Sequence, residues 1–112
     1  MLNYNNRKFR PLKNSKNGEV SEDLIFHYSQ EGNILTCKYS GANILAGHLI
    51  GLVDPRGNID MRYHQVNKHG EIKTGICHSK PVVLANGKIQ LLEDWEWTSG
   101  GKGKGTSVLE EL

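Results

Sequence analysis

The sequence is constrained most strongly by a short turn motif that occurs four times along the chain. In each copy a glycine is followed by a polar residue and then by an isoleucine, which begins a segment of alternating apolar residues. Glycine provides the positive φ that tight hairpin turns require, and the β-branched isoleucine favours a strand. The copies are Gly32-Asn33-Ile34, Gly57-Asn58-Ile59, Gly70-Glu71-Ile72 and Gly87-Lys88-Ile89. Successive turns of this kind predict an antiparallel β-meander.

The spacing of the turns predicts an all-β fold, because no segment has a convincing helical period. We expect eight strands, at 6–13, 20–30, 33–40, 44–53, 58–67, 71–79, 88–98 and 105–111. Pro81 is expected to end the sixth strand because proline lacks an amide donor. Eight consecutive antiparallel strands can close into an up-and-down barrel, which removes exposed strand edges. We therefore predict a single barrel domain over residues 1–112, with an open curved sheet or a sandwich as alternatives.

The composition agrees with a small barrel and argues against other classes. The chain has 112 residues, of which 37% are hydrophobic, and a closed single sheet buries only one face of each strand. It has no apolar run of about 18 residues, and residues 1–12 lack the apolar core of a signal peptide, so we expect a cytoplasmic protein without membrane contact. The net charge of +2, with both signs interspersed, does not favour nucleic acid as a partner.

The two cysteines, Cys37 and Cys77, are expected to be reduced and buried. A zinc site needs about four ligands, and the chain has no Cys-x-x-Cys pair to supply half of them. We therefore expect neither a metal nor another cofactor.

One parity of the strands is expected to face the barrel interior and to carry candidate ligand-binding residues. Aromatic side chains beside a few polar groups are typical of a small-molecule pocket. Among them, Glu93 is the most informative, because a buried carboxylate needs a partner or a raised pKa. Alternatively, Glu93 lies at the rim and Trp95 and Trp97 serve only to pack the core. The candidate ligand-binding residues are Tyr28, Tyr63, His78, Glu93, Trp95 and Trp97.

The opposite parity carries a polar row made of Asp60, Arg62 and His64. Residues two apart share one face of a strand, so an acid, a guanidinium and an imidazole should lie in line. If the turn at His69 and Gly70 has two residues, Arg62 lies opposite Cys77. Such a row could orient a histidine or hold a small anion, or it could form charge pairs on the outer face.

The segment 47–53, together with 59–67 and the stretch from Trp95 to Gly100, resembles a family of small uncharacterised bacterial proteins. Members of that family are often labelled N-acetylglutamate synthase. The resemblance implies a calycin-like barrel similar to those of lipocalins and avidins. The order of Trp, Thr-Ser-Gly and Ser-x-Leu between Trp95 and Leu109 is also similar to the carboxy-terminal hairpin of avidins.

These observations favour a non-enzymatic module that binds a small apolar or aromatic molecule, and we assign no catalytic residue. One alternative is an acyl-transfer enzyme, which the family label implies and which would use His64 or His78 with Glu93. Another alternative is an interaction or assembly protein. The segment 45–53 is apolar on both parities, which is compatible with a homodimer.

Overall fold

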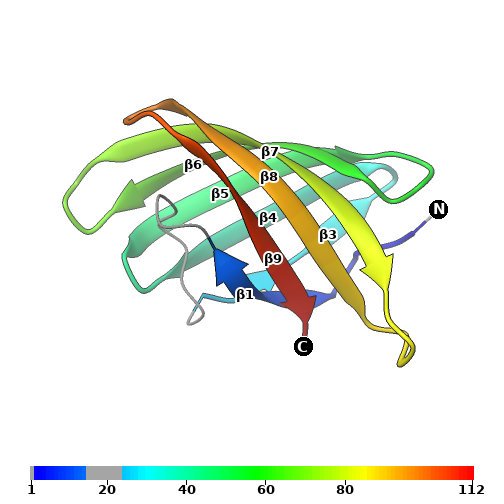
Figure 1. Cartoon of the computed structure of the whole chain (residues 1–112). Coiled ribbons are helices and arrows are strands. Elements are labelled where there is room, and N and C mark those ends of the chain that lie inside the picture. The colour runs from blue at the N-terminus through cyan, green and yellow to red at the C-terminus, as the bar shows by residue number, and fades with distance from the viewer. Residues whose placement is uncertain (1, 15–23) are drawn as a thin grey trace.

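The computed structural model describes residues 2–14 and 24–112, which form nine strands in one antiparallel sheet (Figure 1). The strands are β1 (Lys8–Asn14), β2 (Phe26–His27), β3 (Ser29–Glu31), β4 (Ile34–Gly41), β5 (Ile44–Val53), β6 (Ile59–Asn67), β7 (Ile72–Val83), β8 (Ile89–Ser99) and β9 (Lys104–Glu111). The predicted all-β meander is confirmed. The described residues contain no helix that could cross a membrane.

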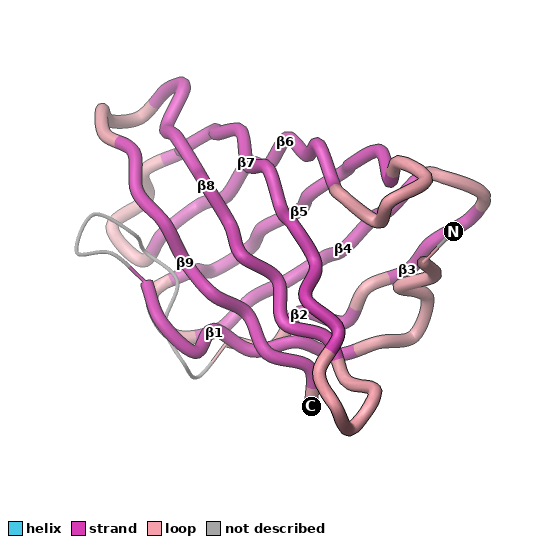
Figure 2. Tube along the Cα trace, turned by 45° about the vertical axis from the view of Figure 1, so that its right-hand side comes forward, coloured by secondary structure: helices cyan, strands magenta, loops and turns pink. Residues whose placement is uncertain are grey.

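The sheet curves into a nearly closed barrel because its two edges meet on one short segment (Figure 2). β2 pairs with β1, whereas β3 pairs with β4 at the opposite end of the strand order. Tyr28, which lies between β2 and β3, accepts a hydrogen bond from the Asn6 amide and donates its own amide to the Arg7 carbonyl. Segment 26–31 therefore replaces the single strand predicted at 20–30, and residues 20–23 of that prediction lie outside the described residues.

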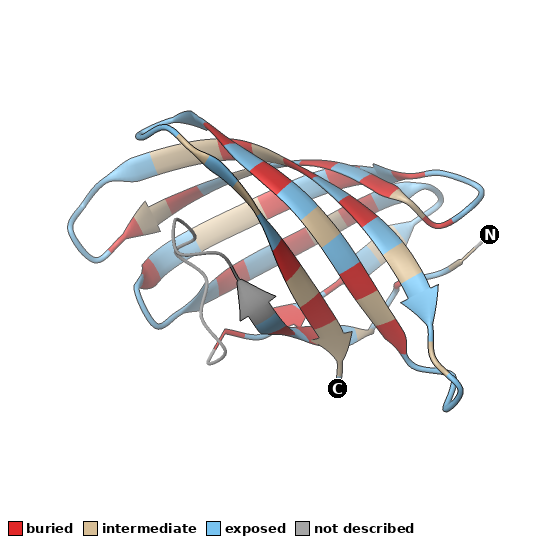
Figure 3. Ribbon diagram, in the orientation of Figure 1, coloured by how far each residue is buried: buried red, intermediate tan, exposed pale blue. Residues whose placement is uncertain are grey.

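The glycines of the turn motif lie between strands, as the sequence predicts. Gly32, Gly57, Gly70 and Gly87 all have positive φ. Along the strands that follow them, buried and exposed residues alternate (Figure 3). The buried parity includes Leu35, Leu49, Met61, Leu91 and Leu109, which belong to one continuous core inside the barrel.

The prediction that Pro81 ends a strand is wrong. β7 continues through Pro81, which lies opposite Leu91 on β8. On the other side of β7, pairing with β6 ends where Ser79 lies opposite Ile59. Pro81 therefore has a neighbouring strand on one side only, so its missing amide leaves no ladder hydrogen bond unmade.

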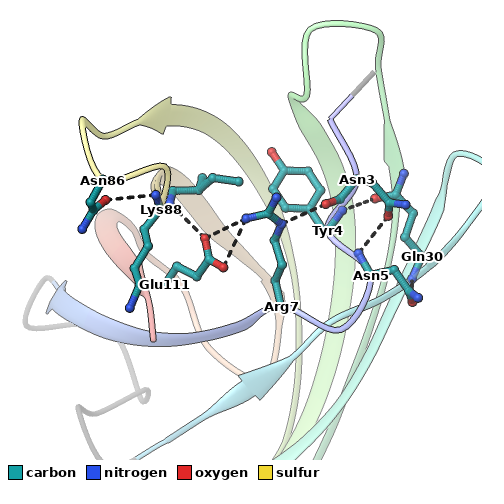
Figure 4. Close-up of polar contacts among 9 residues, drawn as sticks. Asn3, Tyr4, Asn5, Arg7, Gln30, Asn86, Lys88 and Glu111 are labelled. Carbon is teal, nitrogen blue, oxygen red and sulfur yellow. Dashed lines mark hydrogen bonds and ion pairs between the residues drawn. The ribbon is translucent and has the colours of Figure 1, made fainter.

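An amino-terminal arm, residues 2–7, closes one end of the barrel (Figure 4). The fully buried Tyr4 donates its hydroxyl to the Gly57 carbonyl and its amide to Oε1 of Gln30. Arg7 forms an ion pair with Glu111 of β9 over 2.9 Å. The arm is thus tied to the β5–β6 turn, to β3 and to β9.

Candidate functional site

The barrel holds a cavity of about 70 Å³, and six of the described residues that line it are aromatic. Six of the residues that line it carry the argument that follows: Tyr28, Tyr39, Tyr63, Glu93, Trp95 and Trp97. Five of these are predicted ligand-binding residues, and the sixth, Tyr39, was not predicted. Apolar cavities with a few convergent polar groups are typical of small-molecule sites.

Glu93 lies at the centre of a polar row that crosses three strands on the inner face. The register places it directly between Ser79 on β7 and Ser107 on β9. The Ser79 hydroxyl donates to Oε2 over 2.7 Å, and the Ser107 hydroxyl donates to Oε1 over 3.1 Å. Burial raises the pKa of Glu93, and these hydrogen bonds oppose that rise only in part. No ion pair to Glu93 occurs among the described residues.

Tyr28 supplies a second polar group to the same cavity. Its ring is fully buried and packs on Phe9, with ring centroids 5.1 Å apart. Its hydroxyl has no hydrogen-bond partner within the part of the chain that the structure describes. Burial raises the pKa of Tyr28 well above its ordinary value, and the charge of Glu93 adds to that rise. The hydroxyl is therefore a protonated donor that is available to a bound group.

The tryptophans form one wall of the cavity together with Tyr63. The ring centroids of Trp95 and Trp97 lie 5.8 Å apart, and those of Tyr63 and Trp97 lie 5.6 Å apart in an edge-on arrangement. Lys73 places its ammonium group 5.0 Å from the centre of the Trp97 ring. Such spacings are those of favourable aromatic and cation–π contacts.

Glycine allows the Tyr63 ring to reach this position. A Cβ on Gly75, which faces Tyr63 across β6 and β7, would lie 2.3 Å from Cζ of that ring. The same relation holds between Gly47 and Tyr39, where a Cβ would lie 2.2 Å from the ring. The Tyr39 hydroxyl then donates to Oε1 of the buried Gln65 over 2.9 Å.

His78 does not belong to this cavity, contrary to the prediction. The turn after β6 has three residues, 68–70, rather than two, because the Asn67 amide bonds to the Glu71 carbonyl. A shift of one residue in register turns every side chain of β7 to the opposite face. His78 is consequently on the outside, where its Nε2 lies 3.2 Å from Oδ1 of Asp60.

The predicted polar row also lies on the outer face, with a different set of partners. Asp60 forms an ion pair with Arg62 over 2.6 Å, and both side chains are at least half exposed. Arg62 lies opposite Ile76, not opposite Cys77 as predicted. His64 lies opposite Thr74 on one side and His48 on the other. The acyl-transfer alternative paired Glu93 with His64 or His78, but the sheet separates the carboxylate from both imidazoles.

The same register error conceals Ser79, because a two-residue turn would place it opposite Asp60 on the outer face, whereas in the structure it lies opposite Ile59. The inward orientation of Ser107 could be predicted from the sequence, because it lies two residues before the apolar Leu109 on the same strand and therefore shares its face. Cys77 also lines the cavity, and burial raises the pKa of its thiol well above the ordinary value. Cys77 and Cys37 are both buried and free, as predicted.

A family model described as avidin-like protein matches residues 2–112. The chain belongs to the avidin-like family. No curated protein and no solved structure matches this chain. The family match covers every strand of the barrel and agrees with the calycin-like fold that the sequence resemblance implies. An avidin-like barrel with an aromatic cavity is suited to hold a small molecule.

Proposed function

We propose that this avidin-like barrel is a non-enzymatic protein that binds a small molecule between Glu93 and Tyr28. The observation that carries the proposal is the pairing of these two groups in one cavity. Glu93 has hydroxyl partners but no cation among the described residues, and Tyr28 has a buried hydroxyl without a partner. Both arrangements cost free energy in the empty protein, and a ligand that satisfies both groups removes that cost.

The chemistry of the two groups defines the ligand class. An ionised carboxylate only accepts hydrogen bonds, whereas the Tyr28 phenol is a donor at physiological pH. The matching ligand group therefore presents an N–H to Glu93 and an oxygen to Tyr28, as an amide or a urea does. The apolar or aromatic part of the ligand then lies against Trp95 and Trp97.

The size of the cavity limits how much of the ligand is enclosed. An engineered cavity of about 150 Å³ admits benzene. The cavity of about 70 Å³ in this barrel is smaller, so it accommodates a polar head of a few atoms. A larger ligand would have to extend past the aromatic wall.

The intrinsic fluorescence of the protein tests this proposal directly. Trp95 and Trp97 are the two tryptophans of the chain, and both line the cavity. We expect saturable changes in their emission when the full-length protein is titrated with acetamide, with 2-imidazolidinone or with biotin. Glu93→Gln and Tyr28→Phe should each weaken the affinity at least tenfold. Asp60→Asn, which changes a carboxylate on the outer face, is the matched control and should bind as the wild type does.

Absence of a saturable change with all three probes would overturn the proposed ligand class. An equal loss of affinity in Asp60→Asn would also contradict it, because that residue does not line the cavity. The non-enzymatic part is tested separately by incubating the protein with acetyl-CoA and glutamate. Turnover that is lost in Glu93→Gln would establish the acyl-transfer alternative instead.

The remaining predictions concern location and assembly. The free thiols of Cys37 and Cys77 support the proposed cytoplasmic location, since disulfides are rare there. On the outer face of β4 and β5, Ile34, Ile50 and Leu52 are all exposed, and Ile34 lies opposite Leu52. Self-association through this surface stays a prediction. Sedimentation of the wild type and of Leu52→Lys tests it, and two monomeric proteins would refute it.

A further inference from the structure

Two histidines lie side by side on the outer face of the barrel, away from the cavity. His48 on β5 and His64 on β6 are directly opposite in the antiparallel register. Their ring centroids lie 5.5 Å apart, and the ring planes meet at 36°. The sequence positions are sixteen residues apart, so only the pairing of β5 with β6 brings the two imidazoles together.

The nitrogens of both rings are available. Within residues 2–14 and 24–112, neither imidazole takes part in a hydrogen bond or an ion pair. His78 differs in this respect, because its Nε2 already faces the Asp60 carboxylate. Two unengaged imidazoles held on neighbouring strands are a preformed pair of nitrogen ligands.

We propose that His48 and His64 together bind one divalent transition-metal ion. A metal bound at about 2.1 Å through a ring nitrogen lies about 3.2 Å from the ring centroid. Two imidazoles then have centroids about 4.6 Å apart at the 90° angle of a tetragonal site and about 5.3 Å apart at a tetrahedral angle. The observed 5.5 Å is close to this range, so rotation of the side chains brings both rings onto one ion.

The surroundings of the pair define which ions the site takes. The two histidines border a surface groove with Ala46 and Val66 on one side, and Lys38 lies opposite His48 on β4. No carboxylate lines this groove among the described residues, and hard cations need carboxylate ligands to offset their charge. Imidazole binds Cu²⁺ most strongly among the first-row divalent ions, followed by Ni²⁺ and Zn²⁺. Because His64 is exposed, water can complete the coordination sphere.

The test uses the full chain and all five of its histidines. Copper is titrated into the protein while the imidazole ring protons are followed by NMR, and the affinity is measured by calorimetry. We expect one Cu²⁺ per chain and selective broadening of the His48 and His64 signals. His48→Gln and His64→Gln should each lower the affinity at least tenfold. His69→Gln and His78→Gln are matched controls and should retain the wild-type affinity.

Three results would overturn the site. Equal broadening of all five histidines would show non-specific binding, and sharp signals throughout would show that copper binds away from the histidines. An affinity that is unchanged in the double variant His48→Gln, His64→Gln would show that the pair is not the ligand set. Both positions face outward, so we expect each variant to keep its fold, and thermal unfolding checks this. A loss of affinity in a folded variant is then a loss of metal ligands. The outcome is independent of ligand binding inside the barrel.

Discussion

Two carboxylates of the barrel, one on its outer face and one on its inner face, have different kinds of partner. Asp60 on the outer face lies within 2.6 Å of Arg62 and 3.2 Å of His78, and half of its side chain is exposed. Glu93 on the inner face lies between the hydroxyls of Ser79 and Ser107. The carboxylate that is half exposed to water therefore has a cationic partner in Arg62, whereas the carboxylate that is more buried has only neutral hydroxyl partners.

The difference shows that the two carboxylates have different physical roles. An exposed ion pair contributes about 0–1 kcal/mol, because water competes with the partner. A partly buried carboxylate without a cation loses hydration that two hydroxyls restore only in part, so it makes the folded state less stable. An exposed ion pair accounts for Asp60, whereas Glu93 has no cationic partner among the described residues and is the group to which the proposed function assigns the ligand.

The largest expected difference between the two faces is in packing. Leu91 and Leu92 are neighbours on β8, but Leu91 is 0% exposed and Leu92 is 41% exposed. We expect Leu91→Ala to lower the free energy of unfolding by about 2–5 kcal/mol because it leaves a cavity in the core. Leu92→Ala should change it by about 0.5 kcal/mol or less. Urea denaturation of both variants measures this, and similar losses would contradict the assignment of faces.

A smaller loss in the free energy of unfolding is expected at Gly75, where the missing side chain leaves room for the Tyr63 ring. In Gly75→Ala the new Cβ would meet the Tyr63 ring, which must then move from its place beside Trp97. Overpacking of this kind costs about 1–3 kcal/mol. Combining Gly75→Ala with Tyr63→Leu should recover part of the loss, because the shorter side chain vacates the space. Strict additivity of the two substitutions in urea denaturation would show that they do not meet.

These particulars also show how far the sequence alone can lead. The glycine-polar-isoleucine motif was sufficient to place the strands that follow it, because glycine turns and isoleucine strands are local preferences. It did not determine the number of turn residues. At Gly70 the loop has three residues, since the Asn67 side chain accepts hydrogen bonds from the amides of His69 and Glu71.

That single residue decides which side chains of β7 face the cavity. It moves His78 outside and brings Ser79 to Glu93. Barrel closure is equally inaccessible to local reasoning, because it depends on hydrogen bonds between Tyr28 and Asn6 and Arg7, which lie 22 and 21 residues earlier in the chain. The aromatic wall was predictable because Trp95 and Trp97 share one parity of β8. The sequence therefore predicts Glu93 and the aromatic wall of the site, but not the two serine hydroxyls that donate hydrogen bonds to Glu93.

An effect of about 1 kcal/mol is expected from a pair of tyrosines within the inner face. The rings of Tyr4 and Tyr28 are both fully buried, with centroids 6.3 Å apart. Among the described residues only the Tyr4 hydroxyl has a hydrogen-bond partner, the Gly57 carbonyl. Tyr4→Phe should lower the free energy of unfolding by about 1 kcal/mol, since it leaves that carbonyl unpaired. Tyr28→Phe should leave the free energy of unfolding unchanged or raise it. A comparable loss in both variants, measured by urea denaturation, would show that the Tyr28 hydroxyl is satisfied in solution.

The smallest expected effect is on the pH dependence of stability, and it tests the carboxylates directly. Burial raises the pKa of Glu93 in the folded chain, so over a range above the ordinary glutamate value of about 4.3 the folded state holds a proton that the unfolded state has lost. In this range the contribution of Glu93 to stability falls as the pH rises, and it stays constant above the raised pKa. Glu93→Gln removes this contribution, so its stability relative to the wild type should increase with pH.

The pH dependence of the free energy of unfolding, measured in steps from pH 4 upward, checks this expectation. Asp60→Asn is the control, because it removes a carboxylate from the outer ion pair and leaves Glu93 in place. Its curve should therefore keep the slope that Glu93 produces. Parallel curves for the wild type and Glu93→Gln would mean that Glu93 is as well solvated as Asp60, and the contrast between the two faces would then be lost. A ligand that donates an N–H to Glu93 should shift the same transition to lower pH, because it favours the ionised carboxylate.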